Sequence, residues 1–301
     1  MTPDSRPTVL RVLHETGYAY DAPVELAHHL GHLRPRDTAV QRVRSWTLEV
    51  TPAPDGGLHE SVDPWGNHRV SFSHAQVHDQ LQVVSRFVAE IVPLPALQPQ
   101  TSPAWETVAE RLRYRPGAGF DAAVEFTLGS AYAPREASLA RYAAGAFRPA
   151  TPLLVGALAL MHRIFRDFAY RPLATSVNTR APEALAQRQG VCQDFAHVMI
   201  GAMRSIGLAA RYVSGYLLTH PPPGQPRLIG ADASHAWVSV WCPVHGWVAL
   251  DPTNAVPAGV EHVTLAWGRD YADVAPLRGV IRGGGQAVPR VAVTVEPLQG
   301  T

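Results

Sequence analysis

A predicted amphipathic helix that begins at Cys192 constrains the fold of this chain more than any other segment. Gly190 precedes the cysteine by two positions. Apolar residues then recur at spacings of three and four, which places them on one helical face: Phe195, Val198, Met199, Ala202, Met203 and Ile206. The sequence therefore puts a thiol at the N-terminus of a buried helix. Unpaired backbone N–H groups and the positive end of the helix dipole would stabilise a thiolate there.

A predicted hairpin further along the chain supplies a histidine and an aspartate. Residues 234–241 and 246–252 alternate as two strands, and the short turn between them makes them hairpin partners. His235 lies on the face of the first strand opposite its small apolar residues, and Asp251 ends the second strand, so we expect the two side chains to be neighbours. With Cys192 they predict a catalytic triad, in which the imidazole takes the thiol proton and the carboxylate orients the imidazole.

Three segments, in this order, resemble the transglutaminase-like (papain-like) superfamily. They are residues 190–197, 233–237 and 251–254. More narrowly, the chain resembles the bacterial transglutaminase-like proteins that carry an extra N-terminal β-rich domain, and residues 268–279 resemble that group as well. The resemblance covers about residues 9–285.

The resemblance implies an α+β fold with two parts. An N-terminal antiparallel β-rich domain precedes a transglutaminase/papain-like core, in which the nucleophile begins a helix that packs on an antiparallel sheet. The residue patterns agree: residues 8–92 alternate as strands, a proline-rich linker follows, and residues 104–285 hold helical patterns and then strands. Residues 286–301 are expected to add a C-terminal strand. Helices are expected over residues 105–114, 135–146, 151–168 and 182–188.

The expected chemistry is attack of the Cys192 thiolate on an amide or peptide carbonyl, which gives a thioester that water or an amine resolves. The Cys192 backbone N–H is one expected oxyanion donor. Animal transglutaminases have a tryptophan upstream of the cysteine, but no tryptophan lies between Trp105 and Trp237. Papain-like proteases use an upstream glutamine instead, for which Gln187 is a candidate by analogy. The missing tryptophan favours hydrolysis over crosslinking.

Further residues are candidates for supporting roles around the triad. Trp237, Asp270 and Tyr271 are candidates for lining the substrate cleft, although Asp270 and Tyr271 fit a solvated loop equally well. A proline-rich loop at residues 221–226 is expected to flank the cleft. Asp194 is expected to cap or pack the start of the cysteine helix rather than to do chemistry. The second cysteine, Cys242, has no predicted helix start nearby and is expected to be structural.

Two alternatives to hydrolysis stay open: acyl transfer to a primary amine, and a non-enzymatic module that binds a peptide or protein. The expected partner is a peptide or protein substrate. A net charge of +1 without a basic cluster argues against nucleic-acid and anionic-membrane partners. The chain contains no lysine, so a crosslinking enzyme of this sequence could not join its own copies through lysine amines.

Composition limits the remaining classes of protein. With 301 residues, 46% hydrophobic and 17% charged, the chain is expected to be globular. Two cysteines make no disulfide framework, and neither a signal peptide nor a membrane span is recognisable, so we expect a cytoplasmic protein with Cys192 reduced. We expect no cofactor. His28, His29 and His32 lack a nearby cysteine or carboxylate in ligand spacing, so no metal site is expected. The oligomeric state cannot be predicted from the sequence.

Overall fold

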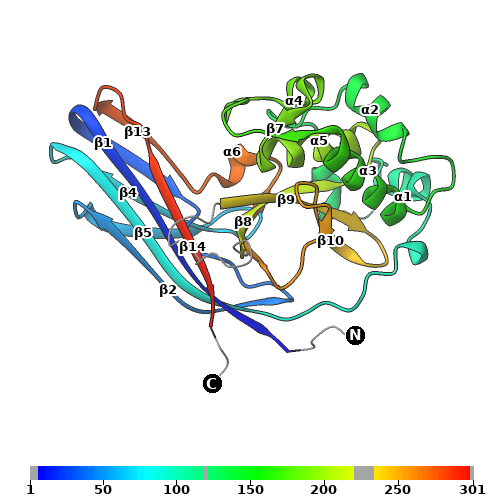
Figure 1. Cartoon of the computed structure of the whole chain (residues 1–301), viewed down its shortest axis with the longest axis horizontal. Coiled ribbons are helices and arrows are strands. Elements are labelled where there is room, and N and C mark those ends of the chain that lie inside the picture. Colours follow the sequence, from blue (N-terminus) through cyan, green and yellow to red (C-terminus); the bar gives the residue numbers. More distant parts are fainter. Residues whose placement is uncertain (1–5, 118, 120, 220–233, 299–301) are drawn as a thin grey trace, which may run out of the picture.

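The computed structural model describes residues 6–117, 119, 121–219 and 234–298, and the loop at 221–226 lies outside them. Two antiparallel sheets lie side by side, and helices cover the second one (Figure 1). The α+β architecture expected from the sequence is thus confirmed. Among the described residues, no helix is both long and apolar enough to cross a membrane.

The first sheet is built around one long strand, β1 (Thr8–Gly31). Four strands pair directly with β1. The sheet has the order β2-β5-β1-β4-β3, and two further strands from the end of the chain also pair with β1. The remaining strands of the chain's first part are β2 (Gln41–Thr51), β3 (Asp55–Val62), β4 (His68–His74) and β5 (His78–Ile91).

The end of the chain returns to this first sheet. β13 (Leu277–Gly283) pairs antiparallel with the second half of β1, and β14 (Arg290–Pro297) pairs with the first half. The core range expected over residues 104–285 therefore needs a correction, because its last strand belongs to the N-terminal sheet. The alternation of Val291, Val293 and Val295 predicted that β14 is extended, but a partner more than 200 residues away leaves no mark on local spacing.

The second sheet has five strands in the order β11-β10-β9-β8-β12. Their bounds are β8 (Ala210–Leu217), β9 (Ser234–Cys242), β10 (Gly246–Asp251), β11 (Val256–Pro257) and β12 (His262–Gly268). The expected hairpin is confirmed: β9 and β10 pair antiparallel, with Trp241 opposite Trp247. Two short strands, β6 (Ala169–Tyr170) and β7 (Gln189–Gly190), pair with each other in parallel and form a separate two-stranded sheet.

The helix α5 (Cys192–Ser205) is the centre of the core. Every residue from Gln193 to Arg204 is buried, and the helix packs on β8 and β9. Other helices surround it: α1 (Trp105–Arg111), α2 (Ala137–Ala144), α3 (Leu153–Asp167), α4 (Ala181–Gln187), α6 (Tyr271–Val274) and the short 3₁₀ turns Pro99–Thr101 and Ala122–Thr127. The ends of α1 to α4 lie within three residues of those expected. Cys242 is buried in the same hydrophobic cluster, as expected for a structural cysteine.

The two sheets share a contact that fixes them against each other. Apolar residues of β1, β5 and β14 form one hydrophobic cluster with residues of β8 and β12. Two amide side chains bridge the sheets by pairing with the backbone of β12. Gln41 donates to the Thr264 carbonyl and accepts its N–H at 2.7 and 2.8 Å, and Asn67 does the same with Trp267 at 2.7 and 3.0 Å.

Candidate active site

Cys192 is the first residue of α5, and the carboxylate of Asp194 holds the start of that helix. Its Oδ2 accepts the Val191 N–H at 2.8 Å and the Thr175 hydroxyl at 2.6 Å. Gly190 is required by this arrangement, since a Cβ there would lie 2.4 Å from that carboxylate oxygen. Asp194 therefore caps the helix as the sequence predicted. The Cys192 N–H, at the first helical position, has no acceptor within the helix.

Asp251 is fully buried at the end of β10 and accepts hydrogen bonds from several donors. Its Oδ2 lies 2.7 Å from His235 Nε2 and 2.7 Å from the Asn254 side-chain nitrogen, and its Oδ1 accepts the Thr253 N–H at 2.9 Å. Burial raises the pKa of Asp251, but the hydrogen bonds from His235 and His262 outweigh it and hold that pKa well below its usual value. The carboxylate is therefore ionised and fixed in place.

His235 uses its second ring nitrogen for the cysteine. Because Nε2 bonds to Asp251, Nδ1 is left for the Cys192 thiol, with which the imidazole also interacts. Burial lowers the pKa of His235, but the hydrogen bonds to Asp251 and Cys192 outweigh it and raise that pKa to about 10. An imidazolium beside a sulfur stabilises the thiolate form. The structure thus brings the three residues of the predicted triad together.

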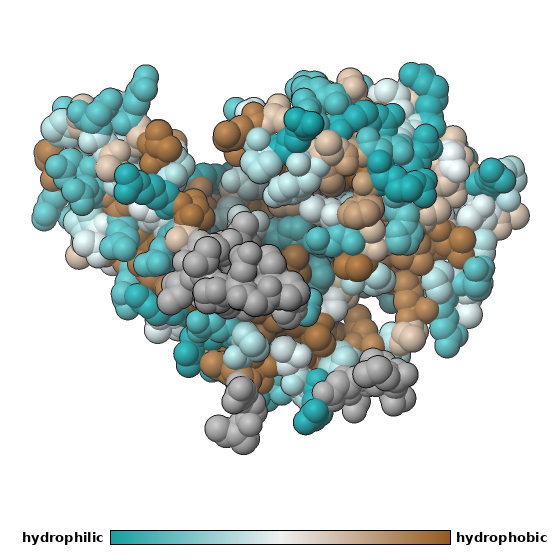
Figure 2. All heavy atoms as spheres, in the orientation of Figure 1, coloured by the Kyte–Doolittle hydropathy of each residue, from teal (hydrophilic) through white to brown (hydrophobic). Residues whose placement is uncertain are grey.

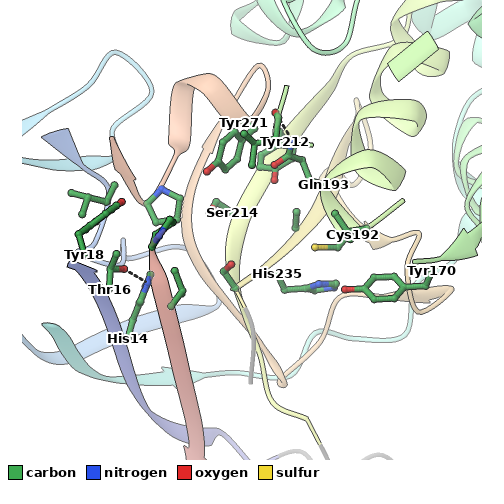
Figure 3. A pocket seen from close by; sticks show the side chains of 18 residues that line it. His14, Thr16, Tyr18, Tyr170, Cys192, Gln193, Tyr212, Ser214, His235 and Tyr271 are labelled. Atoms are coloured by element: carbon green, nitrogen blue, oxygen red, sulfur yellow. Dashed lines mark hydrogen bonds between the residues drawn. The ribbon is translucent and has the colours of Figure 1, made fainter. Parts of the chain in front are cut away.

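The triad opens into a cavity of about 400 Å³ between the two sheets. Cys192, His235, Tyr212 and Gln193 line one side of it (Figure 3). Residues of the first sheet line the opposite side, where His14, Thr16 and Tyr18 project from β1 (Figure 3). The volume lies within the range of small-molecule and side-chain pockets.

Comparison with known proteins identifies the family. Residues 10–90 match the bacterial transglutaminase-like N-terminal region, and residues 140–252 match the transglutaminase-like superfamily. The protein Rv2569c of Mycobacterium tuberculosis is 40% identical to this chain over 298 residues, which is 96% of this chain and 93% of that protein. The chain belongs to the bacterial transglutaminase-like family.

Two other relatives of this transglutaminase-like chain differ in what they share with it. A candidate cysteine protease from Cytophaga hutchinsonii has the same fold, with a TM-score of 0.76 and 20% identity over 99% of this chain and 93% of that one. A protein-glutamine gamma-glutamyltransferase of Pseudomonas aeruginosa is 35% identical over 127 residues, which is 40% of this chain and 19% of that protein.

The transglutaminase-like core contains a second histidine on Asp251 that sequence reasoning missed. His262 Nε2 lies 3.2 Å from Asp251 Oδ2, and its Nδ1 accepts the Gly259 N–H at 3.2 Å. Since Nδ1 accepts, the proton is on Nε2, which donates to the carboxylate. His262 belongs to none of the sequence motifs described above. It is the first residue of β12, which lies at one edge of the sheet.

His235, Asp251 and His262 could also be considered as metal ligands, because their ligating atoms lie within 4.8 Å of one another. Both imidazoles point at the same carboxylate oxygen at hydrogen-bond distance, and the other nitrogen of His262 is already occupied. These contacts account for the cluster as a hydrogen-bond network, so we assign no metal to it.

Besides the triad, the sequence indicated Gln187 as an oxyanion candidate and Trp237, Asp270 and Tyr271 as cleft candidates. Of these four, only Tyr271 lies in the described cavity wall. Gln187 is exposed at the end of α4, where the left-handed Arg188 turns the chain away before Cys192 is reached. Trp237 is 1% exposed and packs edge-on against His262, behind the triad. Asp270 is buried and caps α6 by accepting the Ala272 N–H at 3.0 Å. Gln187, Trp237 and Asp270 thus lie outside the described cavity wall.

Proposed function

We propose that the protein is a thiol-dependent hydrolase of an amide or peptide bond. The observation that carries the proposal is Cys192 at the N-terminus of α5 beside a His235–Asp251 pair whose imidazole has a raised pKa. A free thiol is needed at this position, and the structure has Cys192 unpaired. We place the reaction in the cytoplasm, where a reducing environment keeps the thiol available.

The proposed mechanism has two halves. The Cys192 sulfur attacks the carbonyl carbon of the scissile amide, and the Cys192 backbone N–H donates to the oxygen that becomes negative. His235 gives its proton to the departing amine as the C–N bond breaks, which leaves a thioester on Cys192. His235 then takes a proton from water, the resulting hydroxide attacks the thioester, and the product acid leaves with the thiolate restored. Asp251 keeps the imidazole oriented throughout.

Hydrolysis is favoured over transfer to an amine because none of the described residues that line the cavity is a tryptophan. The similarity of 40% of this chain to part of a glutamyltransferase keeps acyl transfer as the second candidate. We expect the enzyme, given a glutamine-containing peptide and a fluorescent primary amine, to release ammonia and the free acid in excess of amine-labelled peptide. Product masses measure the ratio directly. Amine-labelled peptide as the main product would establish acyl transfer instead. Since the chain lacks lysine, the enzyme has no lysine amine that could compete with the fluorescent amine for the acyl group.

His262 is proposed as a positioning residue for Asp251. We expect His262→Leu to lower kcat/KM by about 10- to 100-fold, as other supporting hydrogen-bond partners do. Because the His262 hydrogen bond lowers the pKa of Asp251, its loss should also move the acid limb of the pH–rate profile to higher pH. His262→Gln, which can donate again, should recover part of both effects, and the exposed His59→Gln should change neither. An unchanged acid limb in His262→Leu would show that His262 only fills space.

A further inference from the structure

The wall of the cavity opposite Cys192 is made by the N-terminal sheet rather than by the catalytic core. Thr16 on β1 and Val291 on β14 are direct cross-strand partners, and both line the cavity. Tyr18, two residues further along β1, lines it as well. Figure 3 shows Thr16 and Tyr18 across the cavity from Cys192 and His235. A substrate bound in this cavity therefore lies between the Cys192 sulfur and the N-terminal domain.

This wall carries no formal charge at neutral pH. None of the described residues that line the cavity is an aspartate, glutamate, arginine or lysine. The one histidine that the N-terminal sheet contributes, His14, is buried, which lowers its pKa to about 4 and keeps it neutral. Its ring is held by the Tyr216 hydroxyl at 2.7 Å and the Thr16 hydroxyl at 3.1 Å. A charged group that entered would lose its hydration without meeting an opposite charge beyond the triad.

Apolar side chains are exposed on both rims of the cavity. Val177 from the core and Val291 from β14 are 58% and 54% exposed, although both line it. In the space-filling view the molecule is hollowed between the N-terminal sheet and the helical layer, with apolar side chains on both sides (Figure 2). Exposed apolar side chains around a pocket are typical of surfaces that a ligand covers.

We propose that the N-terminal domain forms the specificity wall of the active site and selects substrates whose acyl portion is uncharged and apolar or aromatic. This inference rests on the proposed thiol chemistry at Cys192. The aromatic rings that line the cavity, those of Tyr18, Tyr170, Tyr212 and Tyr271, offer faces and hydroxyls to such a group. Acidic and basic groups are excluded because the wall offers them no partner.

The test uses three chloromethyl ketones with the same peptide backbone and a phenylalanine, glutamate or arginine side chain next to the reactive group. In each, the Cys192 sulfur displaces chloride from the methylene carbon, so no acyl acceptor is involved. The second-order rate of labelling is measured by intact mass and divided by the rate with iodoacetamide, which lacks a side chain. We expect the phenylalanine probe to react at least about tenfold faster than either charged probe.

A charge placed on the wall should change that order. Val291→Glu should raise the relative rate of the arginine probe by about tenfold and lower that of the glutamate probe. Val280→Glu is the matched control, because Val280 is an exposed valine of the same sheet, on β13, that does not line the cavity. Equal relative rates for the three probes, or identical behaviour of the two variants, would overturn the specificity wall while leaving the reactive thiol intact. A Cys192 that even iodoacetamide labels no faster than Cys242 would contradict the proposed function itself, and this inference with it.

Discussion

Cys192→Ala is expected to lower kcat/KM for amide hydrolysis by at least about 10⁴-fold while the protein stays folded. The sulfur forms the covalent bond to substrate. The Thr16 hydroxyl across the cavity contacts His14, but that imidazole pairs with the Tyr216 hydroxyl and not with a carboxylate, as His235 does. His235→Ala should cost a similar factor, and the double variant no more than either single one, because residues that act as a unit give non-additive losses.

Cys242 provides the matched control for this prediction. It is fully buried in the hydrophobic core, whereas Cys192 is half-buried at a helix start. Cys242→Ala should therefore lower the free energy of unfolding by about 1 kcal/mol through lost packing and leave kcat/KM unchanged. Circular dichroism and urea unfolding measure the fold, and amide turnover measures the function. A Cys192→Ala protein that retains turnover would rule out covalent catalysis, and a binding module would then be the better account.

Arg204→Met is expected to lower the free energy of unfolding by about 3–5 kcal/mol. Its guanidinium is completely buried near the C-terminal end of α5. It donates to the backbone carbonyls of Phe126, Ala210 and Arg269 at 2.7 to 3.0 Å. Methionine can fill the space of the aliphatic stem but leaves these buried carbonyls without donors.

Arg166→Met is the control for Arg204, because Arg166 is exposed near the end of α3. Its free energy of unfolding should change by less than about 0.5 kcal/mol. Chemical unfolding of both variants measures the difference. A loss below about 1 kcal/mol in Arg204→Met would mean that water replaces the guanidinium hydrogen bonds and that this arginine does not hold α5 in place.

The parts of the site that could be predicted from the sequence are those set by local spacing. The start of α5 at Cys192 follows from a glycine and a helical apolar face, and the β9–β10 hairpin follows from two alternating runs joined by a short turn. The N-cap role of Asp270 is also local, and an aspartate just before a short helix could have indicated it.

The remaining features depend on contacts that are distant in sequence. His262 contacts Asp251 although β9 and β8 separate β10 from β12 in the sheet, so the contact depends on the arrangement of the whole sheet and not on local spacing. Alternation placed Trp237 on the same face as His235, but it could not show that the indole lies behind the triad, where Gly215 on β8 leaves room for it. The cavity wall of Thr16 and Val291 depends on a strand pairing between the two ends of the chain.

The central claim is that His235 and Cys192 form an imidazolium–thiolate pair, and the rate of Cys192 alkylation as a function of pH tests it most directly. The pKa of His235 is raised to about 10, so its charge is present throughout the neutral and acidic range and is lost only as the pH rises through that value. Iodoacetamide should therefore label Cys192 readily at about pH 6. In His235→Gln the thiol should behave as an ordinary one that ionises near pH 8.5, so its labelling at about pH 6 should be roughly 100-fold slower. Labelling profiles that coincide in the wild-type protein and in His235→Gln would contradict the ion pair and the mechanism built on it.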